Sequence, residues 1–220
     1  MKRLGFLLSV FFMLSLPKAN AATLSNDSYT VETKDINTQT TISLPTPTPV
    51  PTQPESHVKE PFVFSLSTPL LDFGEISTTN PVTRTVTLTI HLGDATGYTV
   101  FAIEDHEPTA SSSTLIPDTS CDVGACNTIV SAPWESILTY GFGYRCENIV
   151  GHDCNKSFKT PVAYKRFPNR VKGDAFSSLL QGQNDTKEKQ VNIVYKINTP
   201  ATQEKGIYIN TIQYIAIPDF

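Results

Sequence analysis

The sequence is poor in three features that define large classes of protein. It lacks long stretches rich in Ala, Leu, Glu and Lys, which disfavours a helical bundle. Positive charge is scarce, because 17 Lys and Arg face 21 Asp and Glu for a net charge of −4. Phosphate contacts require surplus positive charge, so we expect no nucleic-acid partner. The apolar run Leu4–Leu16 spans 13 residues, whereas a membrane-crossing helix needs roughly 20.

The N-terminus has the layout of a secretory signal peptide. Lys2 and Arg3 precede the apolar run, and Ala19-Asn20-Ala21 has the small-x-small spacing of a cleavage site. We therefore predict that residues 1–21 are removed before Ala22. The mature chain is expected to be secreted or extracellular, with no transmembrane segment, and any retention on the cell envelope would rest on non-covalent contacts.

Residues 22–61 have the composition of a Pro/Thr-rich linker. Within them, Leu44–Pro51 reads LPTPTPVP. Proline at alternate positions fixes φ and removes amide donors, so neither a helix nor a central strand can form. Such a segment favours extended polyproline II, and we predict a disordered stalk that lifts the next domain from a surface. A tail with no such role is the alternative.

From Phe62 onward the pattern is that of an all-β domain. Alternation is clearest in Arg84–His91, where Val86, Leu88 and Ile90 share one face and threonines the other. Further strands are predicted at Phe62–Leu66, Gly97–Glu104, Ile137–Tyr144, Gln190–Asn198 and Gly206–Ile217. Many short strands are separated by turns, and their threonine-rich sides predict sheets with one face exposed to solvent. This pattern indicates an antiparallel sandwich over residues 62–220.

Two local structures are predicted within this domain. The turn-rich gap at Gly93–Gly97 predicts a hairpin between Arg84–His91 and the strand that follows. Ala175–Gln183 is the one segment predicted as a helical turn or two, capped by Gly182.

The four cysteines, Cys121, Cys126, Cys146 and Cys154, lie in predicted loops. An even number in an exported chain favours disulfides, and four cysteines allow three connectivities. We favour Cys121–Cys126 and Cys146–Cys154, because each closes a short local loop. Free thiols are one alternative. A zinc site that includes Cys154 or His152 is another, although zinc-binding cysteines usually lie two to four residues apart.

A basic segment with interleaved aromatic residues is the main candidate for ligand binding. It runs from Lys156 to Lys172 without an acidic residue, and such a loop can face an anionic polymer. A solvated connection whose aromatic rings enter the core is the alternative. Trp134 is a candidate sugar-stacking platform or a core residue. The predicted ligand-binding residues are Lys156, Lys159, Tyr164, Lys165, Arg166, Arg170, Lys172 and Trp134.

Acidic residues give weaker signals. Glu104, Asp105 and Glu107 follow a predicted strand with His106 among them, and paired carboxylates can perform acid–base chemistry or bind a cation. A solvated strand end is the commoner explanation. Three further candidates for calcium binding lie near the cysteines: Asp118, Asp122 and Asp153. Because no nucleophile elbow or zinc-binding helix motif is present, we predict a protein that is not an enzyme and has no cofactor or metal.

Two segments resemble the beginning and end of exported bacterial β-sandwich domains. They are Leu70–Ile76 (LLDFGEI) and Gly206–Ala216 (GIYINTIQYIA). The layout of Phe62–Phe220 is more distantly similar to the WxL domain family, whose members bind the cell wall non-covalently. Tyr98-Thr99-Val100 and Tyr214-Ile215-Ala216 stand where that family has its Trp-x-Leu motifs, with tyrosine in place of tryptophan. The resemblance implies an immunoglobulin-like or WxL-like antiparallel β-sandwich, here with long disulfide-pinned loops.

Together these features favour an exported, non-enzymatic cell-envelope protein that binds a surface glycan, a cell-wall polymer or another envelope partner. The alternative is a structural subunit of a surface fibre or layer, self-associating through strand edges, because Ile207–Ile217 is long and apolar. A secreted hydrolase that uses Glu104 or His106 is a third hypothesis.

Overall fold

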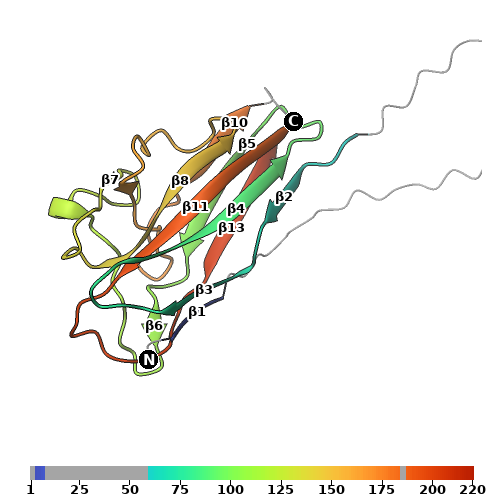
Figure 1. The fold of residues 1–220 in the computed structure, drawn as a ribbon. Coiled ribbons are helices and arrows are strands. Elements are labelled where there is room, and N and C mark those ends of the chain that lie inside the picture. The colour runs from blue at the N-terminus through green and yellow to red at the C-terminus, as the bar shows by residue number, and fades with distance from the viewer. Residues whose placement is uncertain (1–2, 8–58, 184–186) are drawn as a thin grey trace, which may run out of the picture. The chain divides into compact units, whose positions relative to one another are not determined.

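A computed structural model describes residues 3–7, 59–183 and 187–220 (Figure 1). All of these residues belong to one compact unit of the chain. The predicted cleavage site and all but the last residues of the predicted stalk lie outside the described residues.

The described part of the chain is all-β and its main sheets are antiparallel, as predicted (Figure 1). One 3-10 turn at Asp122–Gly124 interrupts the strands. The strands are β1 (Arg3–Leu7), β2 (Val63–Leu66), β3 (Leu70–Glu75), β4 (Val82–His91), β5 (Gly97–Glu104), β6 (Thr109–Ala110), β7 (Ala132–Pro133), β8 (Gly141–Val150), β9 (Ala163–Tyr164), β10 (Ser178–Gln183), β11 (Glu188–Asn198), β12 (Tyr208–Ile209) and β13 (Ile212–Asp219). Within this part, no helix is long and apolar enough to cross a membrane.

Two antiparallel sheets form the layers of a sandwich-like core (Figure 1). One has the order β2-β4-β11-β8, and the other has the order β10-β5-β13. The alternation predicted for β4 is confirmed, since Val86, Leu88 and Ile90 are buried while the threonines between them are partly or fully exposed. The remaining strands form a sheet in the order β3-β1-β12-β6 and the small pair β7-β9.

The predicted hairpin of β4 and β5 is wrong. β4 pairs with β2 and β11, whereas β5 pairs with β10 and β13, so the connection between them crosses from one layer to the other. Gly93 makes this crossing with φ of +56°, and a Cβ there would lie 2.3 Å from the Glu60 carbonyl oxygen. Glycine is therefore required at this position.

The predicted helical turn at Ala175–Gln183 is also wrong. Ser178–Gln183 is strand β10, which pairs with β5. Gly182 packs on the ring of Tyr98, where a Cβ would lie 2.4 Å from the nearest ring atom. It is therefore a point of close approach within a sheet, and the backbone pairing of β10 outweighs its weak local helical preference.

The predicted strands differ from the observed ones by at most two residues at either end, except in two cases. The strand expected from Ile137 begins only at Gly141, and the last strand is divided into β12 and β13. Gly143 of β8 is a point of close backbone approach, because a Cβ there would lie 2.6 Å from the Lys165 carbonyl oxygen.

Aromatic rings fill the centre of the core. Phe167 is fully buried and stacks on Tyr144, with 4.0 Å between ring centroids. Phe142 and Tyr195 lie 5.7 and 5.8 Å from the same ring. Because Phe167 comes from the middle of the predicted basic segment, burial of this ring anchors that segment to the core.

The two disulfides have the favoured pairing, Cys121–Cys126 and Cys146–Cys154. No cysteine is therefore left as a free thiol or as a zinc ligand. Each closes a loop of fewer than ten residues, for which the chain-entropy estimate is about 2–3 kcal/mol. The long loops that they pin lie between β5 and β11.

Candidate functional site

The residues predicted to bind a ligand fall into buried, ion-paired and open groups. Trp134, Tyr164 and Lys165 are buried. Trp134 packs edge-on against Tyr164 at 5.5 Å and donates its Nε1 hydrogen to the Thr139 carbonyl at 2.9 Å. Since its ring is only 1% exposed, it occupies a core position and offers no platform for a sugar.

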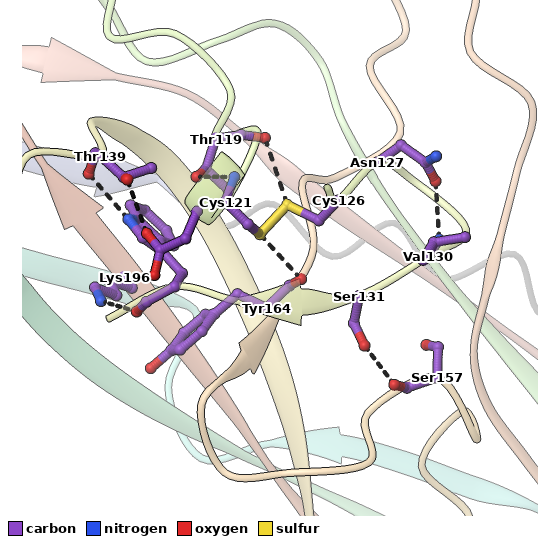
Figure 2. Close-up of a disulfide and its surroundings, with 12 residues drawn as sticks. Thr119, Cys121, Cys126, Asn127, Val130, Ser131, Thr139, Ser157, Tyr164 and Lys196 are labelled. Atoms are coloured by element: carbon purple, nitrogen blue, oxygen red, sulfur yellow. Dashed lines mark hydrogen bonds between the residues drawn. A yellow bond between two sulfur atoms is a disulfide. The ribbon is translucent and has the colours of Figure 1, made fainter. Parts of the chain in front are cut away.

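The Cys121–Cys126 disulfide belongs to the same small cluster (Figure 2). The Lys196 ammonium of β11 lies over the rings of Trp134 and Tyr164, at 4.7 and 5.2 Å from their centroids. Burial lowers the pKa of Lys196, while the nearby Asp122 carboxylate acts in the opposite direction. This arrangement explains the basic and aromatic residues here as internal packing.

Asp122 holds the loop of this cluster in place. Its carboxylate accepts hydrogen bonds from the backbone amides of Glu135 and Ser136, at 2.8 and 3.2 Å, and from the Thr139 hydroxyl at 2.8 Å. Asp153 is also engaged, because it accepts a hydrogen bond from the Tyr98 hydroxyl and pairs with Lys189. In the described ranges, no group of three or more His, Cys, Asp or Glu side chains could hold a metal ion.

Arg166 and Lys172 are neutralised by acidic residues that lie outside the basic segment. Arg166 Nη1 lies 2.6 Å from Asp174 Oδ2, and this hydrogen bond raises the pKa of Arg166. Lys172 Nζ lies 2.7 Å from Asp118 Oδ2 and 2.5 Å from Glu107 Oε1. These cations therefore balance an acidic cluster, and little of their charge is left for an anionic polymer.

Glu104 lies behind this cluster, fully buried at the end of β5. Its oxygens accept hydrogen bonds from the side-chain amides of Asn169 at 3.0 Å and Asn210 at 3.2 Å. Burial, reinforced by the neighbouring Asp118 carboxyl, raises the pKa of Glu104 to about 11. A neutral carboxyl without access to solvent cannot contact a substrate, so Glu104 has a packing role in this arrangement.

Lys156, Lys159 and Arg170 remain exposed. Arg170 donates a hydrogen bond to Gln213, and Lys159 lies on the surface. Lys156 differs because it lines two hollows, of about 720 and 270 Å³, that also share Gln181. We call this surface the Lys156 groove. Its other polar side chains are Thr96, His152, Asp153, Asn155, Ser178, Gln183 and Asp219.

The floor of the Lys156 groove is held by hydrogen bonds and a disulfide. The side-chain amide of Asn155 donates a hydrogen bond to the Ser178 carbonyl at 3.0 Å, and the backbone amide of Gln181 donates one to the Asp153 carbonyl at 2.9 Å. The Cys146–Cys154 disulfide joins β8 to the chain that leads into the groove. These bonds fix the backbone, while Lys156 and the exposed amides of Gln181 and Gln183 face solvent.

Amides, hydroxyls and carboxylates dominate the lining of the Lys156 groove. Such groups exchange hydrogen bonds with a polyhydroxylated ligand, and Lys156 adds a cation for an anionic substituent. The basic segment identified Lys156 as a candidate binding residue, but no sequence pattern predicted that Gln181, Gln183 or Asp219 would lie near it. Those residues converge only because β10 and β13 both pair with β5.

Comparison of the chain with protein-family models, curated proteins and solved structures returned no match. The similarity to WxL domains therefore remains a prediction from the two segments that carry it.

Lys165 yields a stability prediction. Its ammonium is buried with no hydrogen-bond partner among the described residues, 4.9 Å from the centroid of Phe158, and burial lowers the pKa of Lys165 to about 8. Lys165→Met should therefore raise the free energy of unfolding at pH 7 by about 1–3 kcal/mol. The gain should shrink above pH 8, where folded Lys165 is already neutral. Denaturant unfolding at several pH values measures it.

The exposed Lys159→Met is the matched control and should change the free energy of unfolding by less than about 0.5 kcal/mol. A loss of stability in Lys165→Met at pH 7 would show that the ammonium makes a favourable contact.

Glu104 yields a prediction with the opposite dependence on pH. Because folding raises the pKa of Glu104 far above its usual value, the stability that it contributes is present at acid pH and falls as the pH rises toward 11. Glu104→Gln keeps the side chain neutral, so the variant should gain stability relative to wild type from about pH 5 to about pH 9. The exposed Glu188→Gln should track wild type. Parallel curves for wild type and Glu104→Gln would contradict the prediction.

Proposed function

We propose that this protein is an exported, non-enzymatic module of the cell envelope that binds a surface glycan through the Lys156 groove. The observation that carries the proposal is the groove itself. An exposed lysine stands where two polar hollows meet, on a backbone held by the Cys146–Cys154 disulfide.

Three features support export. The N-terminal 21 residues have the layout of a leader, both disulfides suit an oxidising compartment, and a Pro/Thr-rich segment separates the leader from the domain. An immunoglobulin-like or WxL-like topology is proposed with them, on the strength of the antiparallel layers and the two segments similar to such domains.

The groove chemistry favours a hydroxyl-rich polysaccharide with few anionic substituents, because Asp219 offsets the charge of Lys156 in the lining. Exposed amides at Gln181 and Gln183 suit sugar hydroxyls, and Lys156 suits a carboxylate or phosphate. The lining residues of the groove include no Phe, Tyr or Trp ring for stacking, and the imidazole of His152 is their one aromatic ring. A single contact is therefore expected to be weak, and retention on a wall would depend on repeated units of the polymer.

The test is retention of the mature protein on cell walls isolated from its own host. Lys156→Glu should lower binding about tenfold, equivalent to about 1.4 kcal/mol, because it replaces a cation by a carboxylate in a groove already lined by Asp153 and Asp219 and so opposes any anionic substituent of the ligand. The exposed Lys205→Glu changes net charge by the same amount outside the groove lining and should bind like wild type. Equal loss in both variants would indicate a general charge effect, and no loss in either would remove the groove as the binding site.

A further inference from the structure

The larger hollow of the Lys156 groove, of about 720 Å³, carries one cation and one anion. Lys156 and Asp219 are the charged side chains of its lining, and both are exposed. Neither belongs to an ion pair in the part of the chain that the structure describes. Asp153, which lines the smaller hollow, is in contrast paired with Lys189 at 3.5 Å. The larger hollow therefore presents two opposite charges that the protein itself does not neutralise.

The two charges stand on opposite sides of strands β10 and β5. Asp219, at the end of β13, pairs with Gly97 at the start of β5, and β10 pairs with the other edge of β5. The segment that leads to Lys156 lies along the far edge of β10, where the Asn155 backbone amide donates to the Leu179 carbonyl at 2.9 Å. A ligand in this hollow consequently lies between a cation and an anion.

The backbone of Asp219 is fixed, which fixes the origin of its carboxylate. Its carbonyl accepts hydrogen bonds from the Thr96 backbone amide at 2.7 Å and from the Thr96 hydroxyl at 3.2 Å. Gly97 leaves the carboxylate uncrowded, because a Cβ at this position would lie 3.2 Å from Asp219 Oδ2. The anion is thus held at one side of the hollow with room for a partner.

We propose that the Lys156 groove selects a zwitterionic substituent on its glycan, one that carries both an ammonium and a phosphate or carboxylate. The inference rests on the proposed glycan binding and specifies the substituent that the groove recognises. Lys156 binds the anionic half and Asp219 binds the ammonium, each through charge-assisted hydrogen bonds. Such a substituent adds no net charge to the polysaccharide, in keeping with the balanced charge of the lining.

The unpaired charges discriminate between classes of ligand. A neutral ligand that covers both side chains displaces their water and offers only weaker hydrogen bonds in return. An anion satisfies Lys156 but is repelled by Asp219, and a cation meets the reverse situation. A ligand with both charges pairs with both side chains, so it is the class that leaves no charge of the hollow uncompensated.

The test uses the mature protein and three soluble probes of known charge. Glycerophosphoethanolamine carries a phosphodiester and an ammonium, glycerophosphoglycerol carries the phosphodiester alone, and ethanolamine carries the ammonium alone. Dissociation constants from chemical-shift titrations should be at least about fivefold lower for glycerophosphoethanolamine than for either other probe, because a second exposed ion pair adds a modest free energy.

Neutral substitutions assign the two charges. Asp219→Asn should weaken binding of glycerophosphoethanolamine but tighten binding of glycerophosphoglycerol, because it removes the repulsion of the phosphodiester. Lys156→Met should weaken binding of glycerophosphoethanolamine but tighten binding of ethanolamine. A loss of folding would weaken every probe, so it cannot produce these opposite changes. The exposed Glu75→Gln and Lys205→Met remove the same charges outside the groove lining and should leave the order of the three probes unchanged.

Equal affinity for the three probes, or the same order of probes in Asp219→Asn as in wild type, would overturn the inference. Its failure is distinguishable from failure of the proposed function. Host walls that retain the protein through Lys156, without any preference among the probes, would support glycan binding and defeat the zwitterionic substituent.

A lipid headgroup is the other source of the same chemistry. Binding to vesicles of phosphatidylethanolamine mixed with phosphatidylglycerol, but not to phosphatidylglycerol alone or to host walls, would support the selection of two charges. The same result would contradict a glycan as the carrier of the substituent.

Discussion

The pairing of β11 with both β4 and β8 is the constraint on which the rest of the structure depends. This strand keeps register with β4 over ten residue pairs, and with β8 over the eight pairs from Val191 to Asn198. It also supplies two buried lysines, each of which anchors a disulfide loop. Lys189 lies 3.5 Å from Asp153 beside Cys154, and Lys196 donates to the Trp134 carbonyl next to the other disulfide. Displacing β11 would therefore release both loops as well as the sheet.

Most of the basic side chains described above are buried or form ion pairs within the protein. Lys165, Lys189 and Lys196 are buried, and Arg166 and Lys172 pair with carboxylates. A basic run in the sequence thus becomes a set of separate contacts once the chain folds, because its aromatic residues enter the core. Lys156 is instead exposed, on the rim of a polar groove built from β10, the end of β13 and the loop after Cys154.

Most of the correctly predicted parts of the fold came from strong local patterns in the sequence. β4 alternates so regularly that its core face was evident, and short cysteine spacings favoured the correct disulfides, whereas β11 is buried on both faces from Ile193 to Asn198. The layer crossing at Gly93 and the strand character of β10 were missed, because both depend on distant partners, Glu60 and Tyr98. Lys156 was among the candidates. The groove around it was not, because its other side chains meet only through pairing across one sheet.

The most direct measurement is hydrogen exchange of the mature protein with and without soluble fragments of its host's cell wall. The proposed role requires added protection at His152–Lys156 and Gln181–Gln183, two of the backbone segments that line the Lys156 groove. Hydrogen exchange in β4 and β11, which lie outside the groove lining, should be unchanged, because the scaffold is already rigid. Bound fragments that protect a different face, or bind without protecting either segment, would contradict the groove as the site of recognition.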